Sequence, residues 1–145
     1  MVIAFTARIA TIDVDAIFAP AQVIRDLAAR IAKEQNLPAD WLNDDVKGFV
    51  SARPQTTTGN LPQFGHLRVT MPVPEYLLAM KCMAARIGGT QGEKSDVPDI
   101  AFLIRHLGIP SARAVLDLVM QYYPANQIPM RAQYLIEGLF DEDLS

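Results

Sequence analysis

The chain has 145 residues, of which half are apolar and 20% are charged, and its formal net charge at pH 7 is −3. This composition excludes an intrinsically disordered chain. The negative net charge argues against broad electrostatic attraction to nucleic acid. Binding of nucleic acid would then require a local basic patch. The length suits one compact body with a hydrophobic core, so we expect a single domain over residues 1–145.

The single cysteine, Cys82, lies in an apolar run and cannot form an internal disulfide. We therefore expect a buried thiol in a protein of a reducing compartment. No stretch of the sequence reaches the length of a membrane span, and the first residues lack the basic and long apolar segments of a signal peptide. Together these features predict a cytoplasmic protein.

A strand is predicted over residues 11–18, where polar and apolar residues alternate as they do in a half-buried strand. The apolar side consists of Ile12, Val14 and Ala16, and the polar side of Thr11, Asp13 and Asp15. Pro20 then ends the strand and opens a helix, because proline suits the start of a helix and not the middle of a ladder.

An amphipathic helix is predicted over residues 21–36. Its apolar residues recur at the spacing of a helix that buries one face. They are Val23, Ile24, Leu27, Ala28 and Ile31. The sequence Asn-Leu-Pro at residues 36–38 ends the helix. For residues 39–49 we expect a short helix or turn that leads into a brief strand, with Trp41 as an anchor in the core.

An exposed loop and a second strand are predicted next. Residues 53–65 hold two prolines, two glycines and three consecutive threonines, which is a loop composition. Alternation returns over residues 66–71 and predicts a strand there. The strand is expected to end at Pro72, and Pro74 suits the first turn of a following helix.

Helices dominate the predicted second half of the chain. We expect them over residues 74–87, 96–107, from Ser111 to about Tyr122, and over residues 130–140. A glycine-rich loop at residues 88–94 separates the first two, and Gly108 with Pro110 separates the next two. The expected architecture is α+β, with a strand-containing part over residues 1–73 and a helical part over residues 74–145.

The aspartates Asp13 and Asp15 form an Asp-x-Asp pair in the first predicted strand. Residues at i and i+2 of a strand project from the same face, so both carboxylates could bind one divalent cation, and Mg²⁺ prefers such oxygens together with substrate phosphates. The alternative is a pair of solvated acids near a turn. Most Asp-x-Asp pairs are of that second kind, and the apolar and β-branched neighbours are the feature that supports a metal site here.

Lys81 is the second candidate, because it is a single basic residue within an otherwise apolar helix. Its ammonium could neutralise a triphosphate held by the metal. Without further context, the favoured interpretation is that it reaches solvent from the polar side of an amphipathic helix. Asp96 and Asp99 lie at the next helix start, where acids are favoured with or without a function. Arg8 could contact phosphate or simply be exposed.

Five stretches of the chain follow one another in a recognisable order. They are residues 8–18, 40–49, 76–86 with the run Tyr-Leu-Leu-Ala-Met-Lys, 96–100 with Asp-Val-Pro-Asp-Ile, and 107–109. Together they resemble a family of small bacterial nucleotidyltransferase-like proteins, similar to the AbiEii-type nucleotidyltransferases. The resemblance covers nearly the whole chain, and the order of the motifs is more specific than any one of them.

The resemblance implies a polymerase-β-like fold, in which helices flank a small mixed sheet and the C-terminal part is helical. Members of this family transfer one or more nucleoside monophosphates from a nucleoside triphosphate to a tRNA end or a protein hydroxyl. They form the toxin halves of some toxin–antitoxin and phage-defence pairs. The implied cofactor is Mg²⁺, and the implied partners are a nucleoside triphosphate, an RNA or protein acceptor and an antitoxin.

The resemblance also assigns roles to individual residues. Asp13 and Asp15 match the metal-binding pair, and Lys81 matches a lysine that faces the nucleotide phosphates. Asp99, or in second place Asp96, matches a later acid of the active site. Arg8 and Thr11, just before the pair, are the remaining candidate contacts to the nucleotide.

One departure from the family concerns glycine. The family pattern begins with Gly-Gly or Gly-Ser shortly before the aspartates, where small residues let backbone amides approach the triphosphate. This chain has no glycine before Gly48. Two hypotheses follow: an active nucleotidyltransferase, or a catalytically inactive or N-terminally truncated member that acts as a binding module. The apolar residues Val2, Ile3 and Phe5 near the start could promote self-association, so a homodimer is a further expectation.

Overall fold

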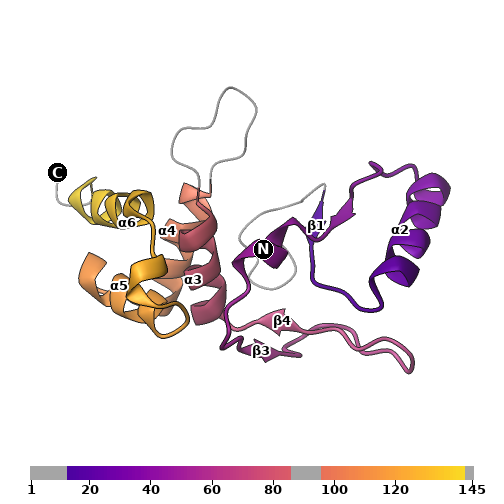
Figure 1. Ribbon diagram of the computed structural model, residues 1–145, viewed down its shortest axis with the longest axis horizontal. Helices are drawn as coiled ribbons and strands as arrows, with labels where there is room; N and C mark the ends of the chain where they lie inside the picture. The colour runs from indigo at the N-terminus through magenta and orange to yellow at the C-terminus, as the bar shows by residue number, and fades with distance from the viewer. Residues whose placement is uncertain (1–12, 86–95, 143–145) are drawn as a thin grey trace. The chain divides into compact units, whose positions relative to one another are not determined.

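The computed structural model describes residues 13–85 and 96–142. The chain divides into two compact units between Val50 and Ser51. We call the described residues 13–50 the N-terminal unit and the described residues from 51 onward the C-terminal unit. Helices and short two-stranded sheets occur together, as the α+β prediction requires (Figure 1). The predicted loop over residues 88–94 lies outside the described residues.

The N-terminal unit contains a short parallel sheet. Strand β1, Val14–Asp15, pairs with strand β2, Leu42–Asn43. The amide of Val14 donates to the carbonyl oxygen of Trp41 at 2.6 Å, and the amide of Ala16 donates to that of Asn43 at 2.9 Å. Within the described part of residues 11–18, the strand is therefore shorter than predicted. On the apolar side of this strand, Val14 is 43% exposed and Ala16 is partly buried.

Helix α2, Ala21–Gln35, confirms the helix predicted after Pro20. It ends at Asn36, which adopts a left-handed conformation with φ of 54° and donates its amide to the carbonyl oxygen of Ala32. Asparagine tolerates this conformation better than most residues, which explains why the helix stops there.

The buried face of α2 matches the predicted one only at Ala28. Val23, Leu27 and Ile31 are all exposed, whereas Ala28 and Ala32 are buried. The small alanines let the chain that follows the helix approach its backbone. In that contact the indole Nε1 of Trp41 donates to the carbonyl oxygen of Ala28 at 2.9 Å. Trp41 is only partly buried, so it is not the core anchor that the sequence predicts, and it joins the helix through this hydrogen bond.

The segment that follows α2 contains the predicted turn and brief strand. A turn at residues 39–40 leads into β2, and a short 3₁₀ helix η1, Asp45–Phe49, follows the strand. Strand β2 pairs with β1. The side chain of Asn43, at the end of β2, accepts a hydrogen bond from the amide of Asp45 at 3.2 Å. Asparagine commonly forms such a bond two residues ahead, and it turns the chain into η1.

A two-stranded antiparallel ribbon begins the C-terminal unit. Strand β3, Thr56–Thr57, pairs with strand β4, Met71–Pro72. The strand predicted over residues 66–71 is therefore wrong except at its last residue. Alternation alone cannot form a strand without a partner, and β3 offers a partner to two residues only. The intervening residues 58–70 form an irregular connection with exposed side chains at Phe64 and Leu67.

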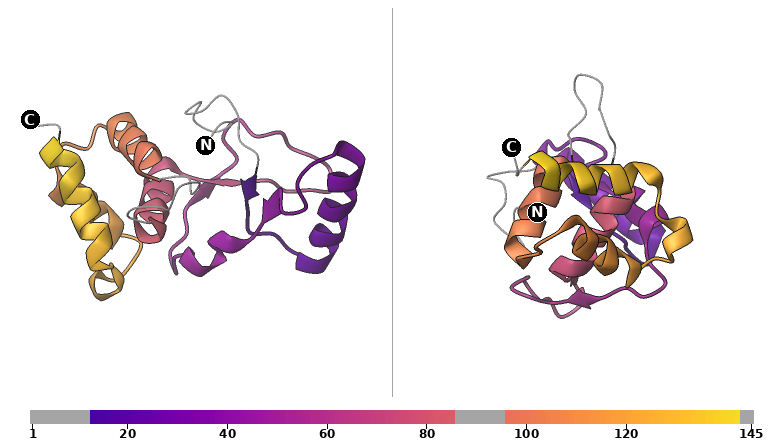
Figure 2. Two further views of the ribbon diagram at one scale, coloured as in Figure 1. Left: turned by 90° about the horizontal axis from the view of Figure 1, so that it is seen from above. Right: turned by 90° about the vertical axis from the view of Figure 1, so that its left-hand side faces the viewer.

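Four helices make the core of the C-terminal unit. They are α3 (Pro74–Ala84), α4 (Val97–Leu107), α5 (Ala112–Met120) and α6 (Met130–Glu142), with a short 3₁₀ helix η2 (Ala125–Gln127) before the last. Helix α3 packs against the other three (Figure 1, Figure 2). All four helices were predicted, with differences of a few residues at their ends.

Apolar side chains from the four helices fill this core. The largest that are fully buried are Leu78, Ile100, Leu103, Ile136, Val115, Val119 and Cys82. Burial raises the pKa of the Cys82 thiol to about 12, so this residue behaves as a small apolar side chain, as expected. Across residues 13–85 and 96–142, no helix is long and apolar enough to cross a bilayer.

Candidate functional site

The structure brings three of the candidate residues together in the C-terminal unit. The ammonium of Lys81, on α3, lies 3.0 Å from Oδ2 of Asp99 and 3.2 Å from Oδ1 of Asp96. Asp99 belongs to the first turn of α4, and Asp96 directly precedes that helix. We call these residues the Lys81 cluster.

Local sequence explains why Lys81 needs these partners. Helix α3 is apolar on almost every side, and six of its eleven residues are buried. An ammonium on such a helix loses much of its hydration, and this loss is costly unless anions replace the water. Acids favoured in the first turn of the neighbouring α4 supply those anions.

The three side chains of the Lys81 cluster differ in exposure. The side chain of Asp99 is 7% exposed, that of Lys81 is 21% exposed and that of Asp96 is 34% exposed. Lys81 therefore does not simply reach solvent from the polar side of a helix. It is a half-buried cation held by one buried and one partly exposed carboxylate. The motif order suggested Lys81 and Asp99 separately, and the structure adds their direct contact with each other and with Asp96.

The aspartate pair belongs to the N-terminal unit. Asp13 and Asp15 are both exposed, on either side of Val14 in β1. Their carboxylates are the donor type that Mg²⁺ prefers, and their exposure allows a hydrated ion to reach them. Among the described residues, no group of three or more histidine, cysteine or acidic side chains is placed to hold a metal. Arg8 and Thr11 lie outside the described residues.

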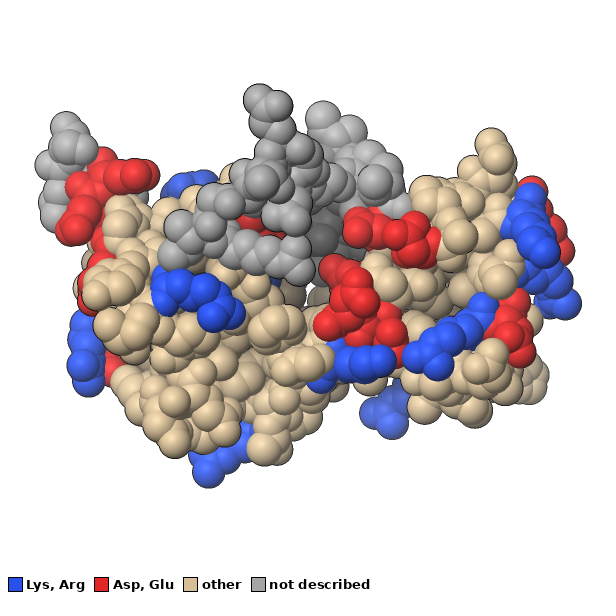
Figure 3. Space-filling model, turned by 45° about the horizontal axis from the view of Figure 1, so that its top comes forward, with Lys and Arg blue, Asp and Glu red and all other residues tan. Residues whose placement is uncertain are grey.

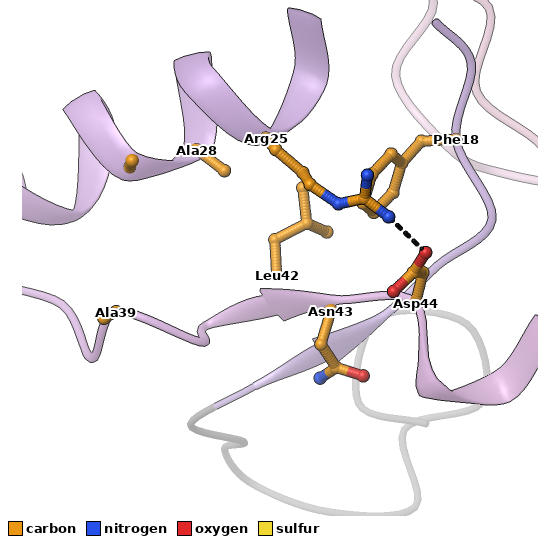
Figure 4. A pocket seen from close by; sticks show the side chains of 8 residues that line it. Phe18, Arg25, Ala28, Ala39, Leu42, Asn43 and Asp44 are labelled. Carbon is orange, nitrogen blue, oxygen red and sulfur yellow. Dashed lines mark hydrogen bonds and ion pairs between the residues drawn. The ribbon is translucent and has the colours of Figure 1, made fainter. Parts of the chain in front are cut away.

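The N-terminal unit also contains a charged cluster that the sequence did not predict. Arg25 on α2 donates to Oδ2 of Asp44 at 2.7 Å (Figure 4). Lys47 donates to the same oxygen at 3.1 Å. The Lys47 hydrogen bond, followed by the Arg25 contact, lowers the pKa of Asp44 below its usual value. The guanidinium of Arg25 also lies over the ring of Phe18, 5.7 Å from its centroid.

This cluster borders a small open pocket of about 280 Å³ in the same unit. The pocket is lined by Phe18, Arg25, Ala28, Ala29, Ala39, Leu42, Asn43 and Asp44 (Figure 4). Its size is near the lower limit for pockets that hold small molecules. Only the contact of Asp44 with Lys47 could have been found from spacing, because Arg25 lies nineteen residues from Asp44.

Tyrosines in the C-terminal unit form a second network that the sequence did not reveal. The phenol oxygen of Tyr76 accepts from the amide of Ser51 at 2.9 Å, and the hydroxyl of Ser51 donates to the carbonyl oxygen of Tyr122. The phenol of Tyr122 donates to Oε1 of Gln55 at 2.6 Å. The rings of Tyr76 and Tyr122 stack with their centroids 5.1 Å apart. This network fastens the start of the ribbon to the helices.

Charged side chains of both signs occur on the surface of the described residues. On the face drawn in Figure 3, lysine and arginine side chains of the described residues occur in separate small groups among acidic and uncharged ones. Such mixing of both signs is typical of an ordinary protein surface.

Comparison with known proteins gives no further assignment. No family model, no curated protein and no solved structure matches this chain. Functional interpretation therefore depends on the site geometry and on the order of the motifs.

Proposed function

We propose that this chain is a Mg²⁺-dependent nucleotidyltransferase of polymerase-β-like fold. It would transfer a nucleoside monophosphate from a nucleoside triphosphate to an RNA or protein acceptor, as the toxin of a toxin–antitoxin pair. The observation that carries the proposal is the contact between Lys81 and Asp99, 3.0 Å apart. Two residues that the motif order assigns to one active site, eighteen positions apart, meet in the folded chain.

Lys81 has the properties that a phosphate-binding residue needs. Its ammonium is partly shielded from water, which strengthens its attraction to an anion, and 21% of its side chain is still accessible. The buried carboxylate of Asp99 pairs with this ammonium and so limits the directions in which it can point. A positioned cation stabilises the negative charge that develops during phosphoryl transfer better than a mobile one does.

Asp13 and Asp15 are the residues that would hold the metal. Bound there, Mg²⁺ would polarise the phosphate oxygens of the nucleotide. In the proposed step, an acceptor hydroxyl oxygen bonds to the α-phosphorus while the bond from that phosphorus to the bridging oxygen breaks. Pyrophosphate leaves with the electron pair of the broken bond, and the hydroxyl proton passes to solvent.

The proposal is tested with the purified chain, Mg²⁺ and each α-labelled nucleoside triphosphate, with total RNA or protein as the acceptor. We expect label in an acceptor for the wild type. Lys81→Met and the double substitution Asp13→Asn, Asp15→Asn should each reduce transfer by about a hundredfold, the usual effect of removing one electrostatic contact to the reacting group. Asp117→Asn, which removes a carboxylate paired with Arg113 on the surface of α5, serves as the control.

Three outcomes separate the alternatives. Transfer that depends on Lys81 and on the aspartate pair supports the enzyme. Nucleotide binding without transfer supports the binding module instead. Equal binding of Mg²⁺ and nucleotide by the wild type and by the double aspartate variant rejects the metal site.

A further inference from the structure

The two carboxylates that hold Lys81 are not equivalent. Asp99 is buried within the first turn of α4 and lies 3.0 Å from the ammonium. Asp96 lies just outside that helix at 3.2 Å, with 34% of its side chain exposed. The three groups together carry a formal charge of −1. An anion that approaches Lys81 therefore meets a lysine whose charge is already more than balanced.

The burial of each carboxylate determines which of the two can leave the Lys81 ammonium when another anion binds. If Asp99 left the ammonium, its buried carboxylate would lose a charged partner where water cannot fully replace it, and this costs much free energy. If Asp96 left, its carboxylate would turn toward solvent and regain hydration. Partly exposed ion pairs contribute little stability, so their exchange for another anion is inexpensive.

We propose that Asp96 is a displaceable partner that competes with the substrate triphosphate for Lys81, whereas Asp99 is the permanent anchor. Asp96 neutralises Lys81 while the site is empty and leaves it when phosphate oxygens arrive. It is a positioning residue that sets the affinity of the site for polyphosphate. The identity of the anion rests on the proposed function, but the exchange itself depends only on the geometry of the Lys81 cluster.

Calorimetric titration with inorganic tripolyphosphate tests the competition in the absence of Mg²⁺. Asp96→Asn keeps the size of the side chain and removes the competing charge, so we expect about fivefold tighter binding than in the wild type, the worth of one partly exposed ion pair. Asp117→Asn makes the same change of net charge at the surface pair with Arg113 and should leave the affinity within about twofold. Adding Lys81→Gln to Asp96→Asn should abolish the gain.

A stability measurement tests the anchor. Asp99→Asn should lower the midpoint of urea unfolding more than Asp96→Asn does, because only Asp99 is buried. Equal midpoints for the two variants would overturn the assignment of Asp99 as the anchor.

Several results would overturn the proposed competition. Asp96→Asn could bind tripolyphosphate no more tightly than the wild type, or no variant could bind it. The increase in affinity could also be equal in Asp117→Asn, or it could persist after Lys81 is replaced. The titration is independent of catalysis. Absence of nucleotidyl transfer together with the expected order of tripolyphosphate affinities would reject the proposed enzyme and leave the role of Asp96 intact.

Discussion

Lys81 and Cys82 are neighbours on α3 that meet opposite environments. Lys81 faces two carboxylates and is partly accessible, whereas Cys82 is fully buried among apolar side chains. A helix turns by about 100° per residue, which is enough to place adjacent side chains in different surroundings. The same apolar helix therefore supplies both a charged group for the candidate site and a packed side chain for the core.

The raised pKa of Cys82 predicts a pH dependence of stability. The thiol pKa is raised from 9.0 to about 12 in the folded chain, because burial disfavours the thiolate. The folded state thus holds the thiol proton more tightly than the unfolded state does. This contribution is fully present below pH 9 and is lost as the pH rises from 9 toward 12.

Urea unfolding of the wild type and of Cys82→Ala at several pH values measures this effect. The difference in unfolding free energy between the two proteins should shrink as the pH rises above 9. Comparison with the alanine variant removes the contribution of tyrosines and lysines that titrate in the same range. A difference that stays constant across the range would show that the Cys82 thiol is not shielded.

At the scale of elements, helix α5 begins at an N-terminal cap, Ser111, which the sequence predicts. The hydroxyl of Ser111 accepts a hydrogen bond from the amide of Ala114 at 3.2 Å. Ser111→Ala should therefore lower the unfolding free energy by about 1 kcal/mol, the usual cost of losing such a cap. Thermal unfolding followed by circular dichroism measures the change. Thr58→Ala removes an exposed hydroxyl outside any helix and is expected to have no effect of this size.

Helices and strands differ in how far the sequence predicts them. The signals for α4 are local: Ile100, Leu103 and Ile104 share one face, and Gly108 ends the helix with φ of 64°. The prediction for this helix was correct because periodicity and caps act within a few residues. The alternation over residues 66–71 was equally regular and still predicted the wrong structure, because a strand needs a partner elsewhere in the chain.

The candidate site shows the same division between local and distant information. The order of motifs pointed to Lys81 and Asp99, because each has a recognisable neighbourhood in the sequence. Nothing in the spacing indicated that Asp96 would share the same ammonium, or that Arg25 would meet Asp44. Those contacts depend on how α3 packs against α4 and how α2 packs against the chain after β2, so only the folded structure reveals them.

At the scale of the whole molecule, the C-terminal unit depends on its last helix. Ile136 on α6 is fully buried in a core to which α3, α4 and α5 also contribute. Ile136→Ala should lower the unfolding free energy by about 2–5 kcal/mol, through lost burial and the cavity left behind. Urea unfolding followed by circular dichroism measures the loss. The exposed Glu137, next along the helix, gives a control as Glu137→Ala, with an expected change within about 0.5 kcal/mol.

The hydrogen bond from Trp41 to Ala28 also gives the molecule a built-in optical reporter. Trp41 is the only tryptophan of the chain, and it lies in the N-terminal unit. All four tyrosines, Tyr76, Tyr122, Tyr123 and Tyr134, lie in the C-terminal unit. Indole emission therefore follows the surroundings of α2. The N-terminal unit can be observed on its own in the intact protein, without any attached dye.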